Sequence, residues 1–201
     1  MFPMLINRME ILLIRHGESE GNVLKRVQTN LEPLTDKGKE KVSELRNKLE
    51  KENIEVVFSS DLLRCVQTTE ILFQNKIPVF YKKELREKSN GDFEGKLVSE
   101  VDWMSVKGDF ETKKSPGGES LRDVKCRAEK FLELLKNLKH NKIAVVSHAT
   151  FLRVLLSILL HKKIEEVIMS IELPSCSVSR LEFNNGKFLI KEIQSTQRKQ
   201  G

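Results

Sequence analysis

The segment that most limits the possible folds is residues 11–14, four apolar residues followed directly by Arg15, His16 and Gly17. An uninterrupted apolar run of this length, closed by a glycine, predicts a strand covered on both faces, as in a parallel sheet. Ligands of open α/β sheets bind just beyond the carboxyl ends of such strands. Arg15 and His16 would stand there, where a guanidinium offers several donors to an oxyanion and an imidazole can act as nucleophile or base.

Further short apolar runs predict more buried strands of the same kind. They lie at residues 56–60, 79–81 and 143–147. Amphipathic stretches between them predict helices, because apolar residues recur every three or four positions. These stretches begin after Thr35 or Asp36, after Ser60 or Asp61, after Ser120 and at Ala149. Strands that alternate with helices in this way predict a parallel sheet.

The C-terminal part has a different pattern. Residues 178–183 alternate between apolar and polar side chains, residues 184–187 form a hairpin turn signal, and a second strand follows at 188–193. This hairpin predicts an antiparallel edge of the sheet, and residues 194–201 form a polar tail. We therefore expect an α/β fold, a three-layer α/β/α sandwich with a mostly parallel sheet and an antiparallel edge strand, in one domain over residues 1–201.

Cationic or imidazole side chains follow three of the four apolar runs: Arg15 with His16, then Arg64, then His148. Arg64 would lie in the first turn of a helix, where unpaired backbone amides and the helix dipole favour anions. On its own it fits a surface charge as well as a second phosphate ligand. A shared position at the ends of neighbouring strands favours one common site for these side chains.

A long excursion follows, at residues 88–120. It is rich in glycine, serine and charged residues, with scattered apolar residues and one expected short helix. Excursions of this length in compact domains are usually lids or binding loops. We expect its single tryptophan, Trp103, to pack inside this lid rather than to stack on a substrate.

Composition excludes several other classes of protein. The chain has 201 residues, three cysteines and a net charge of +6. The odd number of cysteines predicts reduced thiols and a cytoplasmic protein, and residues 1–8 show no pattern of a secretion signal. The longest apolar stretch, 154–160, is too short to span a bilayer. Lysines and glutamates alternate along the predicted helices without basic clusters or interleaved aromatics, so we expect no nucleic-acid partner.

Taken in order, several motifs resemble those of the histidine phosphatase (phosphoglycerate mutase-like) superfamily. They are residues 14–19 (Ile-Arg-His-Gly-Glu-Ser), 59–68, 85–87 with 91–95, 116–120 (Pro-Gly-Gly-Glu-Ser), and 146–148 with Leu152 and Arg153. Together they cover nearly the whole chain. The resemblance implies catalysis on phosphate esters by a fold of the kind predicted above.

The resemblance also implies a role for each matching residue. His16 would be the nucleophile that becomes phosphorylated, while Arg15, Arg64 and His148 would bind and neutralise the transferring phosphoryl group. Asn22 and the backbone amide of Ala149 would add donors. By its place in the motif, Glu87 would be the acid that protonates the leaving oxygen, with Glu84 and Glu94 as the alternatives.

These roles agree with the chemistry of phosphoryl transfer, which needs an in-line nucleophile and positive charge on the equatorial oxygens. His16 must be neutral to attack, so we expect its other ring nitrogen to donate to a backbone carbonyl, that of Gly17. Glu87 must be protonated in the first step and then acts as base on water. No leftover cluster has metal-ligand spacing, so we expect metal-independent chemistry without a cofactor.

Departures from the family pattern favour a phosphatase. Mutases of this family typically carry a tryptophan where this chain has Gly21, and a longer insertion than the 61 residues (148 − 87) that separate Glu87 from His148. Thr150, where a smaller residue is usual, would narrow the pocket. A bisphosphoglycerate-dependent phosphoglycerate mutase is the alternative, and a non-catalytic phospho-ligand-binding protein is a second. We expect a small phosphorylated substrate of undetermined identity, and the strand pair at 178–193 offers an edge for a homodimer.

Overall fold

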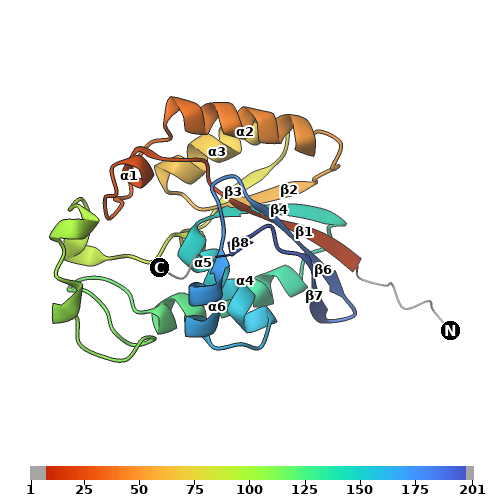
Figure 1. Ribbon diagram of the computed structural model, residues 1–201. Helices are drawn as coiled ribbons and strands as arrows, with labels where there is room; N and C mark the ends of the chain where they lie inside the picture. Colours follow the sequence, from red (N-terminus) through yellow and green to blue (C-terminus); the bar gives the residue numbers. More distant parts are fainter. Residues whose placement is uncertain (1–7, 198–201) are drawn as a thin grey trace.

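A six-stranded sheet forms the centre of the part of the chain that the computed structural model describes, residues 8–197 (Figure 1). Its strands are β1 (Arg8–Arg15), β2 (Val56–Ser59), β3 (Val79–Tyr81), β4 (Lys142–Ser147), β6 (Val178–Asn184) and β7 (Lys187–Glu192). Their order is β3-β2-β4-β1-β6-β7. The first four neighbours are parallel, while β6 is antiparallel to β1 and β7 is antiparallel to β6.

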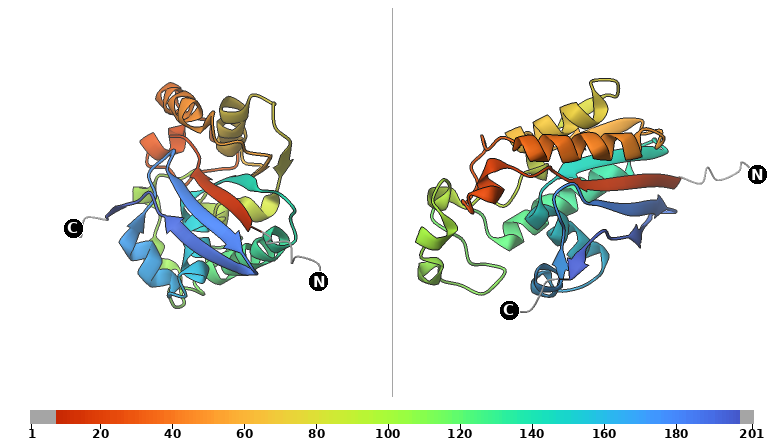
Figure 2. Two further views of the ribbon diagram at one scale, coloured as in Figure 1. Left: turned by 90° about the vertical axis from the view of Figure 1, so that its right-hand side faces the viewer. Right: turned by 45° about the horizontal axis from the view of Figure 1, so that its top comes forward.

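Helices cover both faces of this sheet. They are α1 (Glu20–Val23), α2 (Asp36–Leu49), α3 (Leu63–Phe73), α4 (Leu121–Lys136), α5 (Ala149–Leu159) and α6 (Ile164–Ser170). In Figure 1, α2 and α3 lie above the sheet, whereas α4, α5 and α6 lie below it, and the left panel of Figure 2 shows the same three layers. The expected α/β/α sandwich is confirmed.

Two hydrophobic cores explain why β1 is apolar on both faces. Met9, Ile11 and Leu13 pack into the core shared with α4, α5 and α6. Leu12 and Ile14 point to the opposite core, beneath α2 and α3. All five side chains are at most 2% exposed. Burying such side chains contributes roughly 1.5–3 kcal/mol each, so this strand anchors the whole sheet.

The excursion at residues 88–120 contains three short 3-10 helices rather than the one helix that we expected. A first such turn, η1 (Lys83–Leu85), precedes it, and η2 (Gly91–Phe93), η3 (Val98–Glu100) and η4 (Trp103–Ser105) follow. Two reciprocal bonds close its base: the Ser89 N–H donates to Glu119 Oε2 at 2.9 Å, and the Glu119 N–H donates to the Ser89 carbonyl at 2.9 Å. It extends beside α1 at the left of Figure 1.

The predicted hairpin forms the antiparallel edge of the sheet, with β6 paired to β1 and β7 at the margin. Other local expectations need correction. The N-cap of α3 is Leu62, since Asp61 turns away to bind Arg86 through bonds of 2.6 Å. Part of the predicted tail forms β8 (Thr196–Gln197), which pairs with β5 (Ile171–Glu172). Residues 1–7, most of the segment assessed for a secretion signal, and 198–201 lie outside the described residues.

Candidate active site

The strand order brings the predicted side chains to one edge of the sheet. Strands β1 and β4 are direct neighbours, and the His16 N–H continues their ladder by donating to the Ser147 carbonyl at 3.0 Å. The rings of His16 and His148 consequently lie with centroids 5.0 Å apart. Strand β2 is the other neighbour of β4, and the first turn of α3 beyond it carries Arg64.

His16 is held as a neutral nucleophile. Its Nδ1 lies 2.6 Å from the Gly17 carbonyl, so this nitrogen carries the proton and Nε2 keeps its lone pair. Burial lowers the pKa of His16 well below its ordinary value, and the positive charges of Arg64 and Arg15 act in the same direction. The expected partnership with Gly17 is confirmed.

His148 is wholly buried behind His16. Its Nε2 lies 2.9 Å from Ser60 Oγ and 3.3 Å from Cys65 Sγ. Burial lowers the pKa of His148 well below its ordinary value, with further contributions from Arg64 and His16. Before an anion enters, both imidazoles are therefore neutral, and the guanidiniums supply the positive charge of the site.

Two arginines provide that charge with donors left free. Arg64 is only 2% exposed, and its Nη1 donates to the Thr29 carbonyl at 2.9 Å, while Arg15 Nη1 donates to the Leu173 carbonyl. The Nε atom of each is buried without a hydrogen-bond partner among the described residues. A buried donor without a partner carries a free-energy penalty, which an oxyanion in this position relieves.

Glu87 joins the site from the segment that follows β3. Its carboxylate accepts three backbone N–H groups: Oε1 from Lys88 at 2.9 Å and Phe151 at 3.2 Å, and Oε2 from Thr150 at 3.0 Å. Two of these amides, those of Thr150 and Phe151, belong to the first turn of α5. The Ala149 amide, the first of that helix, is not engaged by this carboxylate.

These groups surround a cavity of about 460 Å³. Arg15, His16, Arg64, Glu87 and Thr150 contribute to its wall, whereas His148 lies beneath it. The wall carries seven basic and three acidic residues: Arg15, Arg26, Arg64, Lys83, Arg86, Lys88 and Arg127 against Glu87, Glu94 and Glu119. A concave site with an excess of positive charge favours a small anion such as a phosphate ester.

A family model for the histidine phosphatase superfamily (branch 1) matches residues 11–196. The chain belongs to this superfamily.

Relatives within the histidine phosphatase superfamily include both phosphatases and mutases. The chain is 34% identical over 140 residues to "Fructose-2,6-bisphosphatase TIGAR" of Xenopus tropicalis, covering 65% of this chain and 51% of that protein. It therefore spans about half the length of that relative. It is 30% identical over 190 residues to "Probable phosphoglycerate mutase GpmB" of Proteus mirabilis, covering 90% and 88%. The structure "Bacillus stearothermophilus YhfR" superposes with a TM-score of 0.83 at 26% identity, over 92% of this chain and 96% of that one.

One histidine phosphatase position predicted from the motif, Asn22, is not brought to the cavity wall. Its Oδ1 accepts from the Ser19 N–H at 3.1 Å and the Ser19 hydroxyl at 2.8 Å, which caps α1. Gln28 and Asn30 supply amide side chains to the wall instead. Their polar segment before Leu34 carried no motif that would have singled them out.

Sequence reasoning also missed several supports of the histidine phosphatase site. Ser60 and Cys65 contact His148, and the Thr68 hydroxyl accepts the Gly17 N–H at 3.1 Å. All three lie within the quoted segment 59–68, so the motif contained them without revealing their roles. Trp103 does contact other residues of the lid, because its ring meets Phe93 edge to face and its Nε1 donates to the Val98 carbonyl at 3.2 Å, but it is 42% exposed and lines the cavity instead of being buried.

Within 8–197, no three or more His, Cys, Asp or Glu side chains are grouped so that they could hold a metal ion. Over the same residues, every helix is too short or too polar to cross a bilayer.

Proposed function

We propose that this protein is a metal-independent phosphatase that hydrolyses phosphate monoesters through a phosphohistidine on His16. The observation that carries the proposal is the burial, charge and hydrogen bonding of the His16 side chain. It is a buried, neutral imidazole whose Nδ1 is held by the Gly17 carbonyl, next to two guanidiniums whose Nε donors have no partner. This combination presents a nucleophile to the phosphorus atom and a cradle of donors to the charged oxygens around it.

The first step transfers the phosphoryl group to the protein. His16 Nε2 attacks phosphorus, the bond between phosphorus and the ester oxygen breaks, and Glu87 gives its proton to that oxygen. The alcohol leaves. Arg15, Arg64 and His148 stabilise the charge on the equatorial oxygens, and the Ala149 amide adds a donor, because electrostatic stabilisation is the largest contribution to such a transfer.

The second step releases phosphate. Glu87, now ionised, takes a proton from a water molecule whose oxygen attacks the phosphorus of phosphohistidine. The bond between nitrogen and phosphorus breaks, inorganic phosphate leaves, and His16 and the protonated Glu87 are restored. One carboxyl group thus acts as acid and then as base.

A bisphosphoglycerate-dependent mutase is the second candidate, favoured by the GpmB relative. It would use the same first step but return the phosphoryl group to a phosphoglycerate before water arrives. Gly21 in place of a tryptophan and the separation of 61 residues (148 − 87) between Glu87 and His148 support the phosphatase. A protein that only binds phospho-ligands is the third candidate, and the complete set of reacting groups argues against it.

One experiment separates the three candidates. The protein is mixed with a chelator, 3-phosphoglycerate and a trace of 2,3-bisphosphoglycerate, and separately with p-nitrophenyl phosphate, and phosphorus NMR follows both samples. Growth of inorganic phosphate supports the phosphatase, 2-phosphoglycerate without inorganic phosphate identifies a mutase, and unchanged spectra in both samples favour the phospho-ligand-binding protein. The His16→Asn variant is the control: it must lose turnover and the acid-labile phosphoprotein while still binding inorganic phosphate. Unchanged turnover in this variant would exclude the mechanism.

The wider setting of the reaction belongs to the same proposal. We infer that residues 1–201 act as one cytoplasmic domain on a small phosphorylated substrate, with residues 88–120 selecting which one. The margin of the sheet at β7 offers unpaired backbone groups through which a homodimer would form. Light scattering on the purified protein measures that assembly directly, and a monomer mass at micromolar concentration would exclude it.

A further inference from the structure

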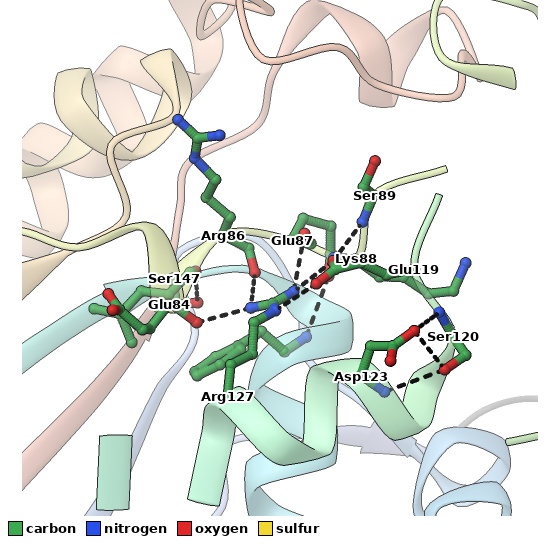
Figure 3. Close-up of polar contacts among 12 residues, drawn as sticks. Glu84, Arg86, Glu87, Lys88, Ser89, Glu119, Ser120, Asp123, Arg127 and Ser147 are labelled. Carbon is green, nitrogen blue, oxygen red and sulfur yellow. Dashed lines mark hydrogen bonds and ion pairs between the residues drawn. The ribbon is translucent and has the colours of Figure 1, made fainter. Parts of the chain in front are cut away.

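Arg127 of α4 holds the backbone on which the proposed acid stands. Its Nη1 donates to the carbonyls of Glu84 at 2.7 Å and Arg86 at 2.6 Å, and its Nη2 donates to the carbonyl of Glu87 at 3.1 Å (Figure 3). Three carbonyls within four residues therefore converge on one guanidinium. Arg86 and Glu87 lie outside any helix or strand, so the bonds from Arg127 satisfy carbonyls that would otherwise lack a regular backbone partner.

Glu119 completes the arrangement from the other side. Its Oε1 accepts from Arg127 Nε at 2.9 Å, and its Oε2 accepts from Arg127 Nη2 at 3.1 Å and from the Ser89 N–H at 2.9 Å. Arg127 and Glu119 therefore hydrogen bond to the backbone both before and after Glu87. Glu119 immediately precedes the N-cap of α4, Ser120, whose hydroxyl bonds with Asp123 fix the start of that helix (Figure 3).

The Arg127 guanidinium also contacts the helix that receives the acid. Its central carbon lies 5.2 Å from the ring centroid of Phe151, and the Phe151 N–H donates to Glu87 Oε1 at 3.2 Å. Arg127 therefore links α4, the segment around Glu87 and the first turn of α5. The side chain is 14% exposed, which limits competition from water.

All five N–H groups of Arg127 are used inside the protein: one at Nε, two at Nη1 and two at Nη2. None is left for a phosphate oxygen. In this respect Arg127 differs from Arg15 and Arg64, whose Nε atoms lack partners. Although Arg127 belongs to the cavity wall, three of its hydrogen bonds go to backbone carbonyls and two to the Glu119 carboxylate.

We propose that Arg127 and Glu119 are positioning residues, which hold the Glu87 carboxyl at the leaving oxygen of the substrate. The inference rests on the proposed function and adds a role for two residues outside the phosphate cradle. A displacement of about 1 Å lowers the rate of an oriented reaction by roughly 100-fold. The loss depends on the leaving group, because a stable leaving anion needs little help from a proton.

The test compares two substrates of similar size, p-nitrophenyl phosphate and phenyl phosphate, whose leaving groups differ in basicity. The variant Arg127→Lys keeps the positive charge near His148 but has three donors instead of five. Arg122→Lys, an exposed position on the same helix, is the matched control. Glu119→Gln is the second variant. The readout is kcat/KM, because it reports formation of the phosphoenzyme.

In Arg127→Lys and Glu119→Gln, we expect the ratio of kcat/KM for p-nitrophenyl phosphate to that for phenyl phosphate to rise about 10-fold or more over wild type. Competitive inhibition by inorganic phosphate and the melting temperature show whether the cradle and the fold are intact. An equal loss for both substrates, or no change in the ratio in either variant, would overturn the inference. Failure of the wild-type protein to hydrolyse p-nitrophenyl phosphate would instead count against the proposed phosphatase.

Discussion

The imidazole rings of His16 and His148 lie 5.0 Å apart, tilted by 58°, in a buried space that also contains two guanidiniums. Among residues 8–197, no carboxylate is hydrogen bonded to either ring. Both pKa values are lowered, chiefly by burial and then by Arg64. The site therefore disfavours protons until an anion balances the charge of the arginines.

This arrangement predicts a loss of stability in mild acid. The unfolded chain binds protons at both histidines near pH 6.5, whereas the folded chain does not. The contribution of these two neutral histidines to the free energy of unfolding is therefore fully present above that pH and falls as the pH decreases below it. Each histidine contributes at most about 1.4 kcal/mol per pH unit. Urea unfolding between pH 5 and 7.5 measures the slope. His16→Asn and His148→Asn should each flatten it, with exposed His161→Asn as control, and equal slopes in all four proteins would contradict the explanation.

From the ion pairs of Glu52 we predict a second pH dependence of the stability, at lower pH. Its carboxylate accepts from Arg180 at 2.6 Å and Lys142 at 3.0 Å, and the Arg180 hydrogen bond is the main cause that lowers its pKa to about 2. The folded pKa lies below the ordinary value of 4.5, so this contribution is present above pH 4.5 and is lost as the pH falls toward 2. After solvent screening, we expect about 1 kcal/mol. Thermal unfolding of Glu52→Gln across this range, against exposed Glu50→Gln, provides the test, and matching curves would contradict it.

Gly38 allows α2 to approach the loop that follows His16. A Cβ at this position would lie 2.1 Å from the Glu18 carbonyl oxygen, which is backbone and cannot turn aside. We expect Gly38→Ala to destabilise the fold by about 1–3 kcal/mol and to lower kcat, because the strain reaches Gly17 and His16. Lys37→Ala, exposed on the same turn, is the control. Unchanged melting temperature and activity in Gly38→Ala would contradict this prediction.

The cysteines should differ sharply in reactivity. Cys65 is fully buried, and burial raises the pKa of its thiol to about 12, whereas Cys126 is exposed on α4. Because the thiolate is the reactive form, iodoacetamide should label Cys126 quickly and Cys65 only after unfolding. Mass spectrometry of the native protein, with Cys126→Ser as control, locates the label. Rapid labelling of Cys65 in the native state would show that the space behind His148 opens.

The elements that could be predicted are those with a local cause. The run at 11–14 is apolar because β1 lies between two cores, and Thr35 caps α2 because its hydroxyl accepts the Gly38 N–H three residues later. The meeting of His16 with His148 could also be predicted, because the ends of parallel strands share one edge of the sheet. Hydrophobic periodicity and the order of the strands are therefore enough to predict the central strand and the meeting of the two histidines.

What could not be predicted depends on distant partners. Asp61 fails to cap α3 because Arg86, 25 residues away, takes both of its oxygens. Asn22 is close to His16 in sequence, yet Ser19 engages its side chain. Arg127 acts through hydrogen bonds to backbone carbonyls 40 to 43 residues away. Every residue has such a carbonyl, so the sequence gives no sign of this role.

The closed base of the excursion has a consequence for engineering this protein. Ser89 and Glu119 join its two ends through reciprocal hydrogen bonds of 2.9 Å, and the five side chains of the proposed reaction lie outside it. A second attachment lies further along, where the Val27 N–H donates to the Lys96 carbonyl at 2.9 Å. We therefore expect that a loop of another length and composition can replace the intervening residues without displacing those five side chains, provided that both attachments are kept.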